Sequence, residues 1–448
     1  MHINVNRTYQ TLESFGTSGG WWAQYAGLWP DAGRRRIASL LFDPISGIGL
    51  TGYRYNLGAG SVESGKGVYW NEYRRAQSFE VAPGVYDWSK DAGAMWFARE
   101  ATRLGCRELV LFMCSPLERM TINGMAQLTP GTTRNVEPTA YPAWAAYACD
   151  AAEHFLNEGL PVKYLSPINE PQWEWSSNNG QEGCHFEPEE IAPVYAAFLA
   201  EMKKRPALAH VELAGPESGE WGGRTQQYVG ALMADASLRS HMSAIDCHSY
   251  WSNTESKISF RRFADTHFPE KRIRMSEWCE MVHGTDPGMD SAIVLAKCVQ
   301  EDLTVLNAAH WCTWVAVSPR GYHDGVIHAW QEEDGSVQVM PLKRLWAYGN
   351  YTRFIRPGFA RVEVTGNDEL HPVAFTGVNN GRERLVIVLI NEQDAPKTDA
   401  VTGDFTAYRT MEIHETSQEC DLDCTYCGAV LQEITLPARS VVTLVLNR

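Results

Sequence analysis

Residues 164–175, YLSPINEPQWEW, join a short apolar run to a glutamate and two tryptophans. Tyr164–Asn169 predicts a β-strand, because the run has strand length and ends in polar residues and a proline. Pro171 stops the run, so Glu170 is left where the strand gives way to a loop. An acid in that position is a candidate for chemistry if the strand belongs to an α/β barrel, where active sites lie at the carboxyl ends of the strands.

Seven further runs share this pattern, and each is followed by an amphipathic stretch typical of a helix. They are Leu12–Thr17, Thr51–Asn56, Leu109–Cys114, Val211–Pro216, Ala244–His248, Arg272–Glu277 and His310–Val315. Gly105 and Gly159 end two of the helical stretches, and Pro188 with two following glutamates begins a third. Eight strand–helix units predict an α/β protein with a (β/α)8 TIM barrel over residues 11–355. No G-x-G-x-x-G fingerprint follows the first strand, which disfavours an open dinucleotide-binding sheet.

Beyond residue 355 the pattern changes from alternating elements to strands alone. The strand-like runs are Val373–Thr376, Leu385–Ile390, Tyr408–Ile413 and Val441–Leu446, with turn residues between them. Residues 1–10 also have the pattern of a strand. We therefore expect a β-sandwich-like side domain formed by residues 356–448 together with residues 1–10.

Charge and hydropathy exclude several kinds of partner. Acidic residues outnumber basic ones by 54 to 39, which gives a formal net charge of −15 and disfavours nucleic acid and anionic membrane surfaces. The longest strong apolar run, residues 385–390, is far below the ~20 residues that span a bilayer. We expect no nucleic-acid partner and no membrane partner. The sequence leaves the oligomeric state open.

The N-terminus and the cysteines bear on the compartment. Residues 1–10 contain neither the basic nor the apolar segment of a signal peptide. We therefore expect a cytoplasmic protein if the chain is full length; a secreted protein whose leader had been removed would begin in the same way. Eight of the 11 cysteines are spread singly between Cys106 and Cys312, a pattern typical of reduced, buried thiols.

Tryptophans gather close to polar residues at the predicted strand ends. Aromatic faces stack on the apolar faces of sugar rings, while amides and carboxylates bind the hydroxyl groups. The tryptophans that we expect to contact an oligosaccharide or polysaccharide substrate are Trp21, Trp22, Trp173, Trp311 and Trp314. A tryptophan-rich core is the alternative interpretation of the same residues.

Two glutamates end predicted strands on opposite sides of the barrel. Glu170 follows the fourth strand, and Glu277 ends the seventh in the run RIRMSEW. Glycoside hydrolysis uses such a pair: one carboxylic acid protonates the leaving oxygen, and the other carboxylate attacks the anomeric carbon or activates a water. This chemistry needs no cofactor and no metal.

Several segments together resemble glycoside hydrolase family 30. They are the run SPINEPQWEW at residues 166–175, the run SEW at residues 276–278, the opening FGTSGGWW at residues 15–22 and QEG at Gln181–Gly183. The chain is most similar to the endo-β-1,6-galactanase branch of the family, and the resemblance covers the whole chain. It implies a retaining double displacement on β-1,6-galactan, either in arabinogalactan side chains or in galacto-oligosaccharides derived from them.

The resemblance also implies a role for each matched residue. Glu170 corresponds to the acid/base and Glu277 to the nucleophile. Asn169 would hydrogen-bond the sugar 2-hydroxyl, an interaction that strengthens in the transition state. Arg54 would keep the nucleophile ionised, and His248 and Tyr250 would face the same barrel mouth. For a retaining enzyme we expect the two carboxyl groups to lie about 5–5.5 Å apart.

Three alternatives remain open from the sequence. Within the family, the activity could be that of a β-xylanase, a glucuronoxylanase or a β-glucosidase-type hydrolase. Arg320 and His323, in the loop after the eighth strand, are candidates for sugar contacts, and the arginine keeps the glucuronic-acid-recognising xylanase open. The second alternative is a non-catalytic carbohydrate-binding protein. The third is an iron–sulfur or zinc protein, since Cys420, Cys424 and Cys427 have the spacing C-x3-C-x2-C. Endo and exo action are not distinguished.

Overall fold

The computed structural model describes residues 1–282, 284–403 and 405–448. Its largest sheet is parallel and has the strand order β8-β7-β6-β3-β2-β12-β11-β10-β9. The two edge strands, β8 (Glu212–Leu213) and β9 (Pro216–Ser218), are separated by only two residues. The two ends of the sheet are therefore parts of one chain segment, and the sheet closes into an eight-stranded barrel, as predicted.

The other barrel strands lie where the sequence placed them, within a few residues. They are β2 (Ser14–Ser18), β3 (Gly52–Asn56), β6 (Glu108–Phe112), β7 (Val162–Ser166), β10 (Ala244–His248), β11 (Arg272–Trp278) and β12 (Ala308–Thr313). The main difference is in β7, which ends at Ser166 and leaves residues 167–170 in the following loop. This brings Asn169 and Glu170 over the barrel mouth.

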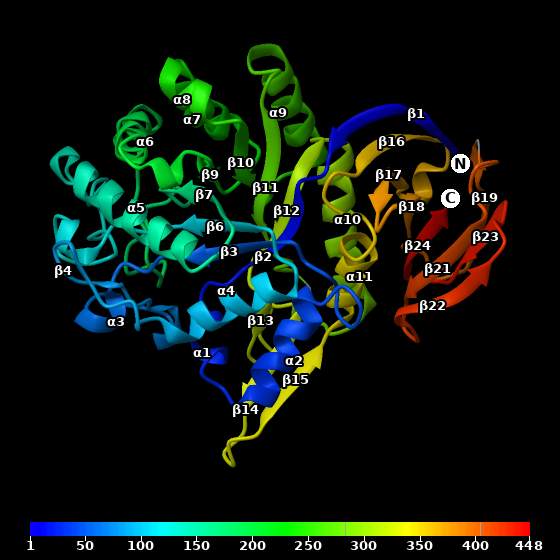
Figure 1. The fold of residues 1–448 in the computed structure, drawn as a ribbon, viewed down its shortest axis with the longest axis horizontal. Helices are drawn as coiled ribbons and strands as arrows, with labels where there is room; N and C mark the ends of the chain where they lie inside the picture. Colours follow the sequence, from blue (N-terminus) through cyan, green and yellow to red (C-terminus); the bar gives the residue numbers. More distant parts are fainter. Residues whose placement is uncertain (283, 404) are drawn as a thin grey trace.

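Helices surround the barrel (Figure 1). The long ones are α2 (Asp31–Phe42), α4 (Ala92–Leu104), α5 (Tyr141–Asn157), α6 (Pro188–Met202), α7 (Gly223–Ala234), α9 (Thr254–His267), α10 (Met289–Thr304) and α11 (Lys343–Thr352). The short ones are α1 (Ala23–Ala26), α3 (Ser61–Ser64) and α8 (Ala236–His241). Helix α6 begins with a capping box, in which Glu187 precedes Pro188 and Glu190 lies in the first turn. The two side chains accept hydrogen bonds from backbone N–H groups that the first turn leaves free.

Short strands outside the barrel belong to its connections. They are β4 (Glu80–Ala82), β5 (Val85–Tyr86), β13 (Val317–Ser318), β14 (Ile327–Gln331) and β15 (Val337–Pro341). The three-stranded sheet β13-β14-β15 follows the eighth barrel strand in the sequence. Its strand β15 packs against α2, the first long helix of the barrel.

The side domain is a sheet with the order β20-β1-β16-β17-β18-β24-β21-β22, covered in part by the pair β19-β23. Its strands are β1 (His2–Thr11), β16 (Ala360–Thr365), β17 (Val373–Asn379), β18 (Arg382–Asn391), β19 (Lys397–Ala400), β20 (Thr402–Gly403), β21 (Thr410–Thr416), β22 (Asp421–Gly428), β23 (Glu433–Leu436) and β24 (Ser440–Asn447). As predicted from residues 1–10, β1 joins this sheet, pairing antiparallel with β16.

The central strand of the side domain explains the apolar run at residues 385–390. Leu385 and Ile387 on β18 belong to the core of the side domain, whereas Val386 and Val388 belong to the core shared with the barrel. Both faces of β18 are therefore buried: one lies in the side-domain core, which also contains Ile434 and Leu436 of β23, and the other packs against α10. The side domain as a whole lies beside α10 and α11 (Figure 1). Among the described helices, none is long and apolar enough to cross a lipid bilayer.

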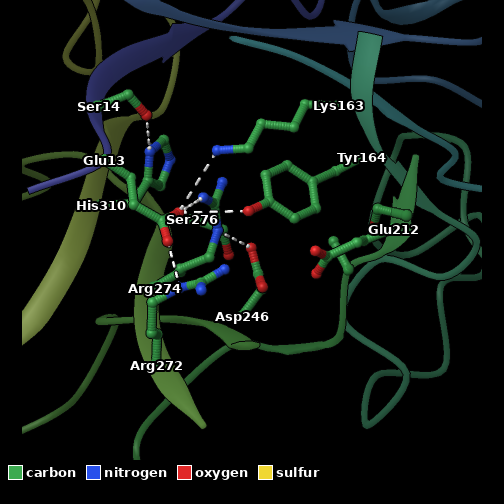
Figure 2. Close-up of polar contacts among 12 residues, drawn as sticks. Glu13, Ser14, Lys163, Tyr164, Glu212, Asp246, Arg272, Arg274, Ser276 and His310 are labelled. Carbon is green, nitrogen blue, oxygen red and sulfur yellow. Dashed lines mark hydrogen bonds and ion pairs between the residues drawn. The ribbon is translucent and has the colours of Figure 1, made fainter. Parts of the chain in front are cut away.

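The interior of the barrel below its mouth is polar (Figure 2). Arg274 is fully buried and forms ion pairs with Glu13, Glu108 and Asp246. A buried charge is tolerated only when it is paired in this way. Burial opposes ionisation of Glu108, but Arg274, His310 and a nearby lysine hold the pKa of that carboxyl well below its usual range.

Candidate active site

Glu170 and Glu277 meet at the barrel mouth and line a cavity of about 350 Å³. Their exposed fractions are 6% and 5%. One carboxylate oxygen of each glutamate lies within 4.8 Å of the other, and a nitrogen of His248 lies within the same distance of both. Two carboxyl groups so close in a buried site can act on the two ends of the same bond of a bound molecule.

Glu277 points into the barrel because β11 is irregular at its end. Side chains of a strand alternate between its two faces, so inward-facing Arg274 predicts Ser276 and not Glu277 inside. The pairing of β11 with β10 shifts its register between Met275 and Glu277. Ser276 and Glu277 consequently both contact groups inside the barrel, as β-bulges permit next to active sites.

Arg54, near the end of β3, holds the nucleophile candidate. Its guanidinium forms an ion pair with Glu277 and donates a 2.7 Å hydrogen bond to Asn169 Oδ1. The guanidinium carbon also lies 3.7 Å from the centroid of the Phe112 ring. Because one guanidinium contacts both side chains, Arg54 holds Glu277 and Asn169 close to each other. A guanidinium also stays charged in proteins, so its attraction for the Glu277 carboxylate is permanent.

Burial raises the pKa of Glu277, while His248 and Arg54 oppose that rise and Glu170 adds to it. The Tyr250 hydroxyl donates a 3.2 Å hydrogen bond to Glu277 Oε1. Burial raises the pKa of Tyr250 well above its usual value, so this hydroxyl keeps its proton. The ionised form of Glu277 is thus held by Arg54, His248 and Tyr250 together.

His248, at the end of β10, lies between three carboxylates. Nδ1 is 3.1 Å from Glu170 Oε1 and 3.7 Å from Glu277 Oε1, and Nε2 is 3.1 Å from Glu217 Oε2. Burial lowers the pKa of His248, but Glu277, Glu170 and Glu217 outweigh burial and raise it to about 10. His248 is therefore an imidazolium at neutral pH.

Glu217 is a functional candidate that the sequence interpretation missed. It is fully buried on β9, and its carboxylate pairs with His248 and Arg54. A signal was available: Glu217 directly follows the predicted fifth strand, in the same position that singled out Glu170. The two residues are also joined through the backbone, where Glu170 N–H donates to the Glu217 carbonyl over 2.8 Å.

Four of the five expected sugar-contacting tryptophans lie at the cleft. Trp173 and Trp314 line the cavity that contains Glu170 and Glu277. Trp21 and Trp22 line an adjacent, mostly apolar cavity of about 210 Å³, and the Trp21 ring meets Trp314 edge-on at 5.2 Å. The two cavities share Tyr322 in their walls.

Trp311 is a correction to the expected set. It is fully buried, its Nε1 donates a 2.9 Å hydrogen bond to Asp302 of α10, and its ring packs against Tyr348 of α11. Strand alternation is the reason: His310 and Cys312 face the barrel interior, so Trp311 faces the surrounding helices. It stabilises the core and does not line the cavity.

Further side chains complete the cavity wall without having been expected there. They include Trp70, Arg74, Trp175, Trp251 and Asp324, all in loops after barrel strands, and His323, which the sequence did suggest. The Arg74 guanidinium lies over the rings of Trp21 and Trp70 and bonds the Tyr322 hydroxyl over 2.9 Å. Arg320 instead stacks on Trp330, at 5.4 Å, and is not part of the wall.

The donor atoms of the site favour acid–base chemistry over metal binding. Glu170, His248 and Glu277 could in principle converge on an ion, but the Arg54 guanidinium and the His248 proton already compensate these carboxylates. Cys420, Cys424 and Cys427 lie on or beside the edge strand β22. Within the described residues, their sulfurs do not converge in a metal-binding group.

The fold and the site define a class of protein. A closed α/β barrel whose mouth holds two adjoining carboxylates, an arginine on one of them and tryptophans around them is the architecture of a glycoside hydrolase. The sequence profile of O-Glycosyl hydrolase family 30 matches residues 1–328. The chain belongs to this family.

Individual relatives have low sequence identity, but the similarity extends over most of the chain. An endo-beta-1,6-galactanase of Hypocrea rufa is 24% identical over 435 residues, covering 91% of this chain and 84% of the relative. Glucuronoxylanase XynC of Bacillus subtilis is 21% identical over 328 residues, covering 71% and 69%. The structure of a conserved exported protein from Bacteroides fragilis superposes with a TM-score of 0.88 at 24% identity, over 99% of both chains. The fold is therefore shared along its whole length.

Proposed function

We propose that this family 30 hydrolase cleaves β-1,6-linked galactan by a retaining double displacement. The observation that carries the mechanism is the approach of Glu170 and Glu277, whose nearest oxygens lie within 4.8 Å. Retaining enzymes have carboxyl groups about 5–5.5 Å apart, whereas inverting enzymes need about 6.5–9.5 Å to admit a water. The short separation supports direct attack by a carboxylate.

The surroundings of the two glutamates support distinct roles. Glu277 carries the guanidinium of Arg54 and the hydroxyl of Tyr250, which favour the ionised form that a nucleophile needs. Glu170 is positioned by its backbone and flanked by Trp173 on the cavity wall, so that it can protonate the leaving oxygen and later deprotonate water. Asn169, oriented by Arg54, is the group that would bind the sugar 2-hydroxyl.

The substrate proposal rests on the galactanase relative together with the segments around Glu170 that resemble that branch. That relative is 24% identical over 91% of this chain. Trp173 and Trp314 offer faces for sugar rings, in keeping with a neutral hexose chain such as an arabinogalactan side chain.

A β-xylan or glucuronoxylan hydrolase is the second candidate. The glucuronoxylanase relative favours it, and so does Arg74 in the cavity wall, because an arginine can bind a uronate carboxylate with two parallel hydrogen bonds.

Product analysis separates these candidates. Arabinose-stripped arabinogalactan and glucuronoxylan are each incubated with the protein, with the Glu277→Ala variant as the blank. Galactose or β-1,6-galacto-oligosaccharides that are absent from the blank support the proposal, and their length shows endo or exo action. Xylo-oligosaccharides would move the substrate to the second candidate. No product from either glycan would contradict both.

A further inference from the structure

The third carboxylate of the site lies beneath the two glutamates that face the cavity. Glu217 is fully buried and has four side-chain partners. Its oxygens lie 3.5 Å from Arg54 and 3.1 Å from His248, accept a 3.2 Å bond from Ser166, and accept a further bond from Ser276. Glu217 is not among the residues that line the cavity, so it does not contact a bound substrate.

Nδ1 of His248 faces Glu170 and Glu277, and Nε2 faces Glu217. Because one carboxylate on each side is ionised at every stage of the proposed mechanism, an imidazolium is the form that both sides favour. A neutral imidazole has one N–H and one acceptor nitrogen, and an acceptor facing a carboxylate would be repelled. The charged and titratable groups that face the Glu217–His248 pair from the packed elements are Arg54, Glu170, Tyr195, Asp246, Cys247, Tyr250, Glu277, His310 and Cys312. Among these, Arg54 is the permanent cation, and it already pairs with Glu277.

We propose that Glu217 and His248 form a positioning pair that keeps a proton on His248 Nδ1 throughout the catalytic cycle, so that this N–H serves whichever of Glu170 and Glu277 is ionised. The inference rests on the proposed retaining mechanism. Glu217 acts only through His248 and Arg54, so it is a positioning residue and not a catalytic one.

The charges of the site support this role because they balance in each state. Before attack, Glu277 and Glu217 are ionised, Arg54 and His248 are cationic, and Glu170 is protonated. In the first step the bond from the anomeric carbon to the leaving oxygen breaks, that oxygen takes the proton of Glu170, and Glu277 bonds to the anomeric carbon. One negative charge has then moved from Glu277 to Glu170, and the five groups still sum to zero.

The second step returns the same charge. Water attacks the anomeric carbon, gives a proton to Glu170, and the broken ester leaves Glu277 ionised. His248 Nδ1 lies 3.1 Å from Glu170, a hydrogen-bond distance, and 3.7 Å from Glu277, an ion-pair distance, so the positive charge of the imidazolium stabilises whichever carboxylate is ionised. Without the carboxylate of Glu217 the site would carry one excess positive charge, and His248 would be the group to lose a proton.

NMR of the protein labelled with 15N-histidine tests the pair without any glycan. The His248 signal, assigned by its loss in His248→Gln, is expected to stay that of an imidazolium beyond pH 8. In Glu217→Gln, His248 is expected to lose its proton about 1–3 pH units lower than in the wild type. In Glu217→Asp, which keeps the carboxylate, the titration of His248 is expected to return most of the way to the wild-type pH. The matched control is Glu108→Gln, which removes an equally buried carboxylate at the opposite end of the barrel and leaves the His248 titration unchanged. A wild-type His248 that loses its proton below pH 7 would overturn the proposal even if no Glu217 variant folds.

Kinetics on the cleaved glycan give a second readout. Removing one pre-organised charge is expected to lower kcat about 100- to 1,000-fold in Glu217→Gln, with KM changed less than about threefold, because Glu217 touches no substrate. The alkaline limb of kcat/KM moves to lower pH, since a site with one negative charge fewer loses its proton more easily. An alkaline limb of kcat/KM at the same pH in Glu217→Gln and wild type would contradict the proposed role of Glu217 and His248. If neither galactan nor xylan is cleaved, the proposed function fails while the NMR result still decides the pair.

Discussion

Replacing Arg54 by glutamine removes the permanent cation from beside Glu277, the proposed nucleophile. In the native site its guanidinium is 2% exposed, pairs with Glu277, lies 3.5 Å from Glu217 and bonds Asn169. Glutamine can still donate a hydrogen bond to one of these groups but carries no charge. Three carboxylates would then share the single imidazolium of His248.

The expected effect follows from the cost of an uncompensated buried charge. Removing one partner of a buried ion pair costs about 3–5 kcal/mol, and each pKa unit corresponds to about 1.36 kcal/mol. Burial already raises the pKa of Glu277 against the opposing effect of Arg54. Without Arg54 it rises further, by about 2–4 units on these figures. Because attack needs the ionised form of Glu277, the acid limb of kcat/KM moves to higher pH by that amount.

The measurement is kcat/KM between pH 4 and 9 on the glycan identified by product analysis, with folding checked by circular dichroism. Arg74→Gln is the control, since Arg74 also lies in the cavity wall but stacks on Trp21 and Trp70 away from the glutamates. It is expected to raise KM and leave the acid limb in place. A folded Arg54→Gln protein with the native acid limb would refute the assignment of Arg54 as the group that keeps Glu277 ionised.

Other variants test separate parts of the site and the core. Glu170→Ala is expected to lose activity about 100- to 10,000-fold on unactivated glycans but to keep it on aryl glycosides with good leaving groups, with azide as the rescuing nucleophile; loss of activity on both substrates would exclude Glu170 as the acid. Trp173→Ala is expected to raise KM about 2- to 10-fold at native thermal stability, whereas Trp311→Ala is expected to lose about 3–5 kcal/mol of stability, measured by urea unfolding; the opposite pattern would reinstate Trp311 as a sugar contact. Arg274→Ala leaves buried acids unpaired and is expected to cost about 3–5 kcal/mol, and a native urea midpoint would contradict the ion-pair network that fills the barrel.

Hydrophobic patterning was enough to predict the architecture, because the elements of this barrel follow the local rules. Short apolar runs between capped helices marked the eight barrel strands, and β18 was visible as an unbroken run since both its faces are buried. The charges inside the barrel were not predictable in the same way. Arg274 and Asp246 sit within apolar runs, and only the closed sheet shows that they pair across the interior.

The same alternation rule separates the expected tryptophans that line the cavities from Trp311, which does not. Trp311 lies between two inward-facing residues of β12, so period 2 alone places it outside the barrel, against α10. Because Trp311 and Trp314 lie in the same run of the sequence, the prediction placed both in the cavity. Trp314 escapes the rule because β12 ends at Thr313, which leaves Trp314 free to turn into the cavity.

At Glu170, Glu277 and Glu217 the local rules fail, and we attribute this failure to the function proposed for the site. Period 2 would turn Glu277 away from the cavity, and a shift of register in β11 brings it in. Glu170 and Glu217 both have positive φ, 47° and 58°, a conformation that residues other than glycine rarely adopt. The three carboxylates thus occupy backbone positions that neither a regular strand nor an ordinary loop provides. Sequences depart from local preferences mainly at functional sites, so the coincidence of three departures around His248 is itself an argument that Glu217 belongs to the same site as Glu170 and Glu277.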